Sequence, residues 1–88
     1  PSIGSRFLLD DDISVAGRHP NADIFLDDVT VSRRHVEFSR SGVSFSLRDM
    51  GSMNGTYLNG ARVDQHELKT GDEIQIGKYH LTFFAGSN

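Results

Sequence analysis

EIQIGKYHLTFF, residues 73–84, is the stretch that decides the fold of this 88-residue chain. Apolar residues alternate with polar ones on both sides of a central Gly-Lys pair, at Ile74, Ile76, Tyr79, Leu81 and Phe83. A period of two is typical of strands that bury one face, and the Gly-Lys pair interrupts it as a turn would. The stretch therefore predicts two strands joined by a tight reversal.

The same pattern recurs in VEFSR (36–40) and VSFSLRD (43–49), with Ser41-Gly42 between them. Asn59-Gly60 separates TYL from ARV and suits a type I′ hairpin, in which both central residues need positive φ. No stretch fits the helical period of 3.6 well. We therefore predict an all-β fold, an antiparallel β-sandwich of many short strands. Most phenylalanines should lie in its core, namely Phe7, Phe38, Phe45, Phe83 and Phe84.

The composition limits the classes of function. Eighty-eight residues suffice for a single domain, 1–88, and the absence of cysteine removes disulfide frameworks, thiol nucleophiles and thiolate metal sites. A net charge of −3 argues against non-specific binding to nucleic acid or anionic membranes. No apolar run approaches the roughly 20 residues that a membrane helix needs. We expect a cytoplasmic protein that needs no metal or organic cofactor.

Two polar segments, 17–35 and 49–60, do not follow the strand pattern, and loops of this length in a small domain are usually functional. In the first, Arg18 and Arg33 offer planar donor groups that can hold a phosphate bidentately, and Ser32 offers a hydroxyl. In the second, Ser52 and Asn54 offer a hydroxyl and an amide, and an amide both donates to and accepts from a peptide main chain. Together the two segments suggest a site for a phosphorylated peptide.

Four motifs in order then carry a resemblance: Gly17-Arg18, Ser32-Arg33-Arg34-His35, the segment GSMNGT at 51–56, and Asn59-Gly60. With these motifs the chain, from about Arg6 to Phe84, resembles a forkhead-associated (FHA) domain, a phosphothreonine-binding β-sandwich of the FHA/SMAD-like type. The resemblance implies about ten or eleven short strands, with the binding loops at one end. GRHPNADIFLDDVTVSRRH and GDEIQIGKYHLTFF further resemble the small actinobacterial FHA regulators of the glycogen-accumulation-regulator and oxoglutarate-dehydrogenase-inhibitor type.

The resemblance implies a function in bacterial Ser/Thr-kinase signalling and a role for each matching residue. Arg18 and Ser32 should contact the phosphate, Arg33 the phosphate or the adjacent backbone, and Asn54 the main chain of the ligand. Further roles implied are a ligand-facing wall at Ser52 and Met53, and structural support at Gly17, His35 and Gly55. The partner implied is a phosphothreonine-containing protein, such as a metabolic enzyme of the 2-oxoglutarate dehydrogenase kind, or the chain's own N-terminal tail.

Other interpretations remain open. Arg18 and Arg33 could be surface charges paired with Asp23, Asp27 or Asp28, and we favour a salt bridge over a ligand contact for Arg34. We interpret His19, His66 and His80 as plain loop or strand residues, and Asn59 as a turn residue. A hydrolase would need Ser32, His35 and an aspartate as a triad, without any accompanying catalytic signature. A third possibility is an interaction module that uses a sheet face.

The N-terminal end departs from the family pattern. FHA domains usually begin with an apolar strand, whereas this chain starts at Pro1 inside the following turn, so we interpret it as an excised fragment with its first strand missing or in a flank. Regulators of this type carry a threonine-bearing tail that folds back onto the loops once phosphorylated. Only five residues precede Arg6, so we expect this chain to bind partners without prior kinase treatment, whereas a longer chain would close.

Overall fold

The computed structural model describes residues 9 and 11–85, and within them the chain forms nine strands and no helix. The predicted all-β class is therefore confirmed, although we expected ten or eleven strands; the anticipated N-terminal departure lies outside the described residues. The strands are β1 (Ile13–Gly17), β2 (Ile24–Phe25), β3 (Val36–Ser41), β4 (Ser44–Asp49), β5 (Thr56–Leu58), β6 (Ala61–Val63), β7 (Gln65–Leu68), β8 (Glu73–Ile76) and β9 (Tyr79–Thr82).

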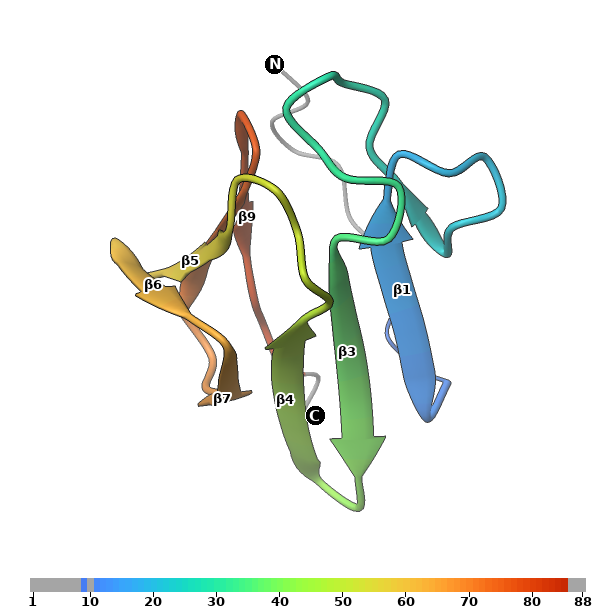
Figure 1. The fold of residues 1–88 in the computed structure, drawn as a ribbon. Helices are drawn as coiled ribbons and strands as arrows, with labels where there is room; N and C mark the ends of the chain where they lie inside the picture. The colour runs from blue at the N-terminus through green and yellow to red at the C-terminus, as the bar shows by residue number, and fades with distance from the viewer. Residues whose placement is uncertain (1–8, 10, 86–88) are drawn as a thin grey trace.

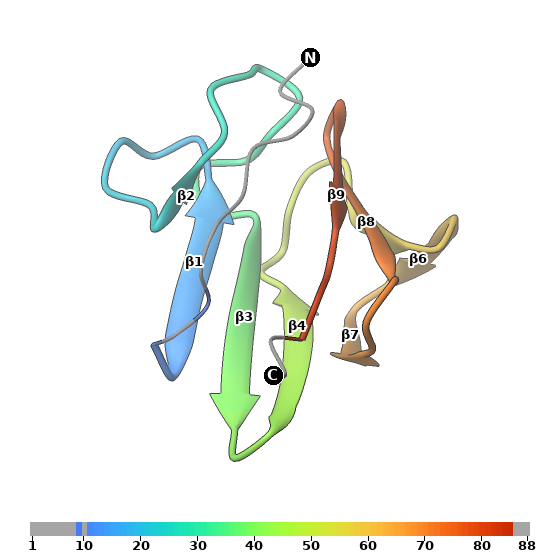
Figure 2. The ribbon, with the colours of Figure 1, turned by 180° about the vertical axis from the view of Figure 1, so that it is seen from behind.

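Two sheets pack face to face, as Figures 1 and 2 show from opposite sides. One has five strands in the order β2-β1-β3-β4-β7, and the other has four in the order β6-β5-β8-β9. Every pairing is antiparallel except that between β1 and β2, which is parallel. The sandwich is thus confirmed, with one parallel pair that the sequence did not indicate.

The core forms where the alternating residues of both sheets meet. In β8, Ile74 and Ile76 are buried while their neighbours are not, so the period-two pattern of the opening stretch is confirmed. Aromatic packing follows the same period, because Phe83 is buried against Phe45, with ring centroids 5.2 Å apart, while Phe84 is 71% exposed. The prediction that Phe84 lies in the core was wrong, since consecutive residues of extended chain point to opposite faces. Phe38 is buried as predicted, and Phe7 lies outside the described residues.

Sequence reasoning missed β1, β2 and β7. The buried positions of β1 are Ser14, Ala16 and Gly17, which are small and give no apolar alternation to detect. The expected strand position of Val43 was also wrong, because Val43 lies in the turn between β3 and β4 and is 94% exposed. The hairpin at Asn59-Gly60 is confirmed: Asn59 has a φ of 51°, and its amide bonds to Asp72 and to the backbone of Glu73.

The loops that hold the candidate site residues gather at one end of the sandwich, in the upper half of Figure 1, together with the turn between β8 and β9. His35, just before β3, donates its N–H to Ala16 of β1 at 3.0 Å and accepts the N–H of Met50, just after β4, at 3.0 Å. Three neighbouring strands of the larger sheet are thereby fixed to one another where the loops begin. The prediction that the binding loops lie at one end is confirmed.

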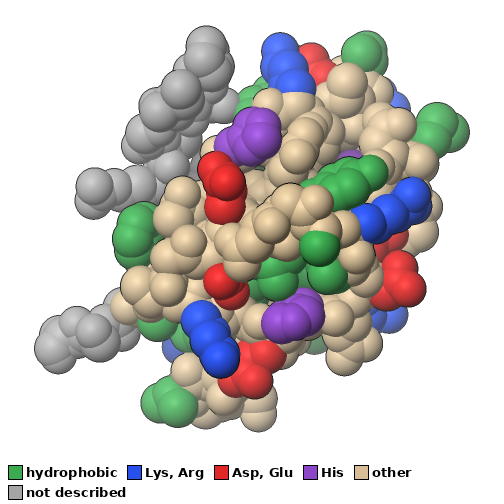
Figure 3. All heavy atoms as spheres, turned by 90° about the vertical axis from the view of Figure 1, so that its left-hand side faces the viewer, with side chains coloured by type: hydrophobic (Ala, Val, Ile, Leu, Met, Phe, Trp, Pro, Cys, Tyr) green, Lys and Arg blue, Asp and Glu red, His purple; other side chains and the backbone are tan. Residues whose placement is uncertain are grey.

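The surface away from the loops is mixed in character. On the face shown in Figure 3, side chains of both charges and histidines surround a small group of hydrophobic ones. In the described part of the chain, no helix is long and apolar enough to cross a membrane.

Candidate functional site

The end of β1 and the loop 26–35, which joins β2 to β3, lie side by side. Arg18 donates its N–H to the Ser32 carbonyl at 3.0 Å, and His19 donates to the Arg33 carbonyl at 3.1 Å. Gly17 makes this approach possible, because a Cβ at that position would overlap the Arg33 carbonyl. The contacts bring Arg18 next to Ser32 and Arg33, which lie 14 and 15 positions further along the sequence.

The arginines at this end have no acidic partner among the described residues. Arg18 donates its Nε–H to the Val31 carbonyl at 3.0 Å, which fixes the side chain and leaves both terminal nitrogens for a ligand. Within residues 9 and 11–85, no ion pair includes Arg18, Arg33 or Arg34. The alternative that these arginines neutralise nearby aspartates is therefore not supported, and neither is the salt bridge that we favoured for Arg34.

Two of the three aspartates offered as partners, Asp23 and Asp28, are used elsewhere in the fold. Asp23 accepts the N–H of Val15 at 2.8 Å, and Asp28 lies 3.2 Å from the ammonium of Lys78. Hydrogen bonds from the hydroxyl and N–H of Thr30, together with Lys78, lower the pKa of Asp28 to about 2. Both carboxylates thus satisfy groups of the scaffold, and positive charge remains on the loops.

His35 is fully buried and connects three segments. Its Nδ1 accepts the N–H of Ser32 at 3.0 Å, so the ring proton lies on Nε2, which is 2.8 Å from the Gly55 carbonyl. With its backbone contacts to β1 and β4, this one residue holds the loop 26–35 against the segment 50–55, which joins β4 to β5. His35 therefore supports a ligand site by fixing the two loops, and not by contacting the ligand itself.

Ser32 has one hydrogen-bonding function in use and one available. Its Oγ accepts the N–H of Met53 at 3.0 Å, which ties the two loops together at the surface. A hydroxyl that accepts in this way still has its own O–H to donate, which suits a phosphate oxygen. The Met53 side chain is 87% exposed beside this contact.

The segment 50–55 folds around the carboxylate of Asp49, which our sequence analysis did not single out. Asp49 accepts the hydroxyls of Ser52 and Thr56 and the N–H groups of Gly51 and Ser52. Burial raises the pKa of Asp49, but these hydrogen bonds outweigh it and hold the pKa below its usual value. The signal in the sequence was an aspartate with Gly51, Ser52 and Thr56 among the next seven residues, a composition typical of a turn closed by a side chain.

This fold of the loop changes the interpretation of Ser52. Its side chain is buried, with 8% exposed, and its Oγ both donates to Asp49 and accepts the N–H of Gly55 at 2.9 Å. The hydroxyl is thus occupied inside the loop, and the expected place in the ligand-facing wall is not where the structure puts it. Gly55 has a φ of 85°, and a Cβ there would meet the guanidinium of Arg62, so this position suits glycine.

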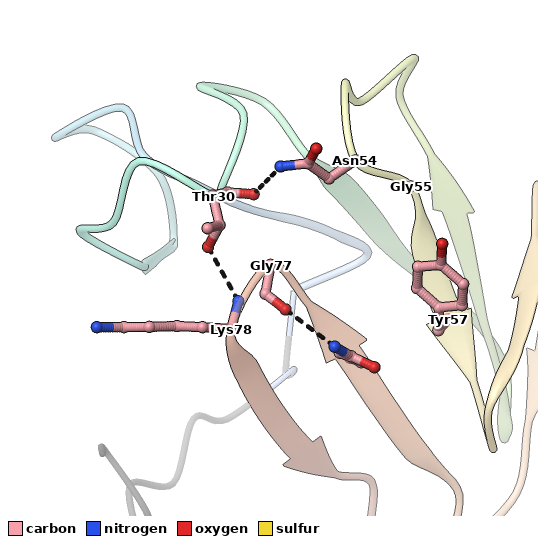
Figure 4. A pocket seen from close by; sticks show the side chains of 7 residues that line it. Thr30, Asn54, Gly55, Tyr57, Gly77 and Lys78 are labelled. Atoms are coloured by element: carbon pink, nitrogen blue, oxygen red, sulfur yellow. Dashed lines mark hydrogen bonds between the residues drawn. The ribbon is translucent and has the colours of Figure 1, made fainter.

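Asn54 is exposed, and its Nδ2–H donates to the carbonyl of Thr30 at 2.9 Å. This contact orients the amide so that Oδ1 points away from Thr30, as Figure 4 shows. Beside Asn54 lies an open pocket of about 310 Å³. It is lined by Thr30, Asn54, Gly55, Tyr57, Gln75, Gly77 and Lys78.

The hydrolase alternative is not supported by the geometry. The imidazole of His35 accepts the backbone N–H of Ser32 rather than its hydroxyl, and its other nitrogen faces a carbonyl. A general base must face the proton that it removes. The described residues also contain no group of three or more His, Cys, Asp or Glu side chains that could hold a metal ion.

Fold and site together define a class of protein: a β-sandwich whose loops at one end carry two arginines, a serine and an asparagine, with no acidic partner for the arginines in the part of the chain that the structure describes. The sequence profile of the FHA domain matches residues 14–77. The chain therefore belongs to the FHA domain family.

Individual comparisons agree. The chain is 59% identical to the oxoglutarate dehydrogenase inhibitor of Corynebacterium jeikeium, and the alignment covers 99% of this chain and 60% of that protein. It is also 59% identical to the glycogen accumulation regulator GarA of Mycolicibacterium smegmatis, in an alignment that covers 98% of this chain and 54% of that protein. The chain thus spans little more than half of these relatives. A solved structure from a study of phosphothreonine-dependent FHA domain interactions superposes with a TM-score of 0.87 and 34% identity, over 92% of this chain and 84% of that one.

Proposed function

We propose that residues 1–88 form one non-catalytic domain that binds phosphothreonine-containing segments of partner proteins in bacterial Ser/Thr-kinase signalling. The observation that carries the proposal is the set of Arg18, Ser32 and Arg33, brought together by backbone contacts and without an acidic partner among the described residues. A phosphothreonine carries about −1.5 to −2 charges near neutral pH and three strong acceptor oxygens, which match two guanidinium groups and a hydroxyl.

Each side chain has a role that its surroundings support. Arg18 and Ser32 contact the phosphate, the first through its terminal nitrogens and the second through its remaining O–H. Arg33 contacts the phosphate or the adjacent peptide backbone. Asn54 uses its outward Oδ1 to accept a main-chain N–H of the ligand, since its Nδ2 is held by Thr30.

The remaining residues shape and support the site. Met53 forms a wall beside the ligand, whereas Ser52 closes the segment 50–55 from inside. His35 braces both loops, and Gly17 and Gly55 permit the close approaches that the loops require. None of these roles needs a metal or organic cofactor.

The partner is a phosphorylated protein, and the relatives suggest its kind. Because one similar protein is named an inhibitor of oxoglutarate dehydrogenase, a metabolic enzyme of that class is our proposed partner, in the cytoplasm. The single site can serve either an external phosphothreonine or one on a neighbouring segment of the same polypeptide.

Calorimetry with one peptide in its threonine, phosphoserine and phosphothreonine forms tests the proposal. Removing one arginine or the serine hydroxyl from the phosphate clamp should cost about 2–4 kcal/mol of binding free energy, so Arg18→Ala and Ser32→Ala should weaken phosphothreonine binding roughly 30- to 1000-fold. Arg40→Ala is the matched control, because Arg40 lies near the far end of β3 and faces Asp12. Unchanged affinity in both loop variants, or equal binding of the unmodified peptide, would show that the site is wrong.

A further inference from the structure

The turn between β8 and β9 contacts the loop 26–35 at Thr30, which is 48 residues away in the sequence. The N–H of Lys78 donates to Thr30 Oγ1 at 3.0 Å, and the ammonium of Lys78 lies 3.2 Å from Asp28 Oδ1. The turn can approach this closely because it carries Gly77, whose Cβ would overlap the hydroxyl and carbonyl of Thr30. In Figure 4 the Lys78 side chain points away from Asn54, so its backbone, not its charge, faces the pocket.

Asp28 holds Thr30 from the other side. Its Oδ2 accepts the N–H of Thr30 at 2.9 Å and also the hydroxyl of Thr30. Because that hydroxyl donates to Asp28 and accepts from Lys78, Thr30 is fixed by three hydrogen bonds at a half-exposed position of an otherwise irregular loop. Such saturation immobilises the backbone of Thr30, including its carbonyl.

That carbonyl is the group that orients Asn54. It accepts the Nδ2–H of Asn54 at 2.9 Å, the one hydrogen bond of this side chain among the described residues. The next two carbonyls, of Val31 and Ser32, accept the Nε–H and N–H of Arg18. The carbonyls of residues 30–32 thus hold the side chains of Asn54 and Arg18. The part of the loop that holds Arg18 is also braced by His35, whereas Thr30 depends on Asp28 and the turn between β8 and β9.

We propose that Asp28, Thr30 and Lys78 are positioning residues of the phosphopeptide site: they hold the Thr30 carbonyl in place and so direct Oδ1 of Asn54 toward the ligand main chain. The turn between β8 and β9 is therefore a third supporting element of the site. This inference rests on the proposed function. In it, Asp28, Thr30 and Lys78 affect recognition of the peptide main chain by Asn54. The phosphate contacts of Arg18 and Ser32 do not depend on these three residues.

The test replaces the Thr30 hydroxyl while keeping the side-chain shape. Thr30→Val removes both hydroxyl contacts, and Thr30→Ser, the matched control, retains them. Calorimetry with a phosphothreonine peptide, at a temperature where circular dichroism shows the variants folded, should give affinity about five- to tenfold weaker for Thr30→Val and within about twofold of the original for Thr30→Ser. In an Asn54→Ala background, Thr30→Val should cause little further loss, because both changes then remove the same contact.

A readout without ligand separates this inference from the proposed function. In nuclear magnetic resonance spectra of the free domain, the Nδ2 protons of Asn54 should exchange with water several-fold faster in Thr30→Val than in Thr30→Ser. If Thr30→Val does not fold, Lys78→Pro, which removes the same N–H donor to Thr30, is compared with Lys78→Ala, which keeps it. Unchanged Asn54 exchange, or a full additional loss of affinity in the Asn54→Ala background, would overturn the positioning role. Absence of phosphopeptide binding in the unsubstituted domain, with Asn54 exchange responding as described, would overturn the proposed function alone.

Discussion

At the scale of single residues, the histidine of the loop motif separates two kinds of contribution. His35 is buried and satisfies the N–H of Ser32 and the carbonyl of Gly55, whereas Asn54 is exposed and makes one hydrogen bond to the Thr30 carbonyl. A buried group that loses its partner costs far more than an exposed one, because water cannot replace the missing hydrogen bond. The two residues should therefore respond differently to truncation.

His35→Ala should lower the free energy of unfolding by about 2–4 kcal/mol, since it removes the partner of the buried Gly55 carbonyl and of the part-buried Ser32 N–H and opens a cavity. Asn54→Ala, an exposed change, should stay within about 1 kcal/mol. Urea unfolding followed by circular dichroism measures both. Equal losses in the two variants would contradict the distinction between bracing and contact.

A second prediction at the scale of single residues concerns Asp49. In Asp49, Oδ2 accepts two N–H groups and Oδ1 accepts two hydroxyls, so Asp49→Asn replaces one of these two acceptors by an amide nitrogen that cannot accept. The segment 50–55 should therefore lose about 1–3 kcal/mol of stability. Asp23→Asn is the matched control, because Asp23 accepts a single N–H at an exposed position. The melting temperatures of the two variants give the comparison, and a larger fall for Asp23→Asn would count against the loop closure described here.

At the scale of elements, the sequence predicted what a repeated pattern or a turn motif encodes. The strands β3, β4, β8 and β9 and the hairpin at Asn59-Gly60 follow from apolar alternation and from a dipeptide that tolerates positive φ. The strand β1 was not predicted, because its buried residues are small and give no apolar alternation. Its pairing also depends on residues distant in the sequence, which a local pattern does not indicate.

The candidate site could be predicted in its polar residues but not in the contacts that support them. Arg18, Ser32 and Asn54 stand out as residue types in a motif. The turn at Gly77-Lys78 was recognised as a reversal, but only the three-dimensional structure places it against Thr30. Similarly, Ser52 as a residue type suggested a ligand contact, and only the position of Asp49 shows its hydroxyl to be occupied.

The turn between β8 and β9 gives a prediction at this scale through two glycines of similar φ. Gly77 (φ 59°) approaches Thr30, and Gly42 (φ 63°) has open space around its Cβ direction. Both alanine variants strain a left-handed backbone, by roughly 1–2 kcal/mol, but only Gly77→Ala also pushes the turn away from the loop 26–35. Gly77→Ala should therefore destabilise the domain more than Gly42→Ala does, as measured by urea unfolding. Equal destabilisation would mean that the turn does not depend on its contact with Thr30.

At the scale of the whole molecule, carboxylates that close loops make the fold sensitive to acid. Hydrogen bonds from Thr30 and the nearby Lys78 lower the pKa of Asp28 from 3.8 to about 2, and a hydrogen bond from Asn59 leads the causes that lower the pKa of Asp72. Asp49 also has a lowered pKa, because its hydrogen bonds outweigh its burial. Each of these carboxylates fixes a connection between two strands: Asp28 the loop 26–35, Asp49 the segment 50–55, and Asp72 the turn between β7 and β8.

A folded-state pKa below the unfolded value means that the unfolded chain binds protons more readily, so unfolding is favoured as the pH falls. The contribution of Asp28 should be complete above about pH 4 and should disappear as the pH falls from 3.8 toward about 2, with Asp49 and Asp72 adding to the same loss. We therefore expect a melting temperature that changes little between pH 7 and 5 and decreases steeply below pH 4.

Asp28→Asn should lower the melting temperature at pH 7 and flatten the decrease below pH 4, since it removes one titrating group from the transition. Asp27→Asn is the control, because Asp27 is exposed and makes no ion pair within residues 9 and 11–85, and it should leave the curve close to that of the unsubstituted domain. If Asp28→Asn and Asp27→Asn give the same acid profile, Asp28 does not stabilise the connection between the loop 26–35 and the turn after β8.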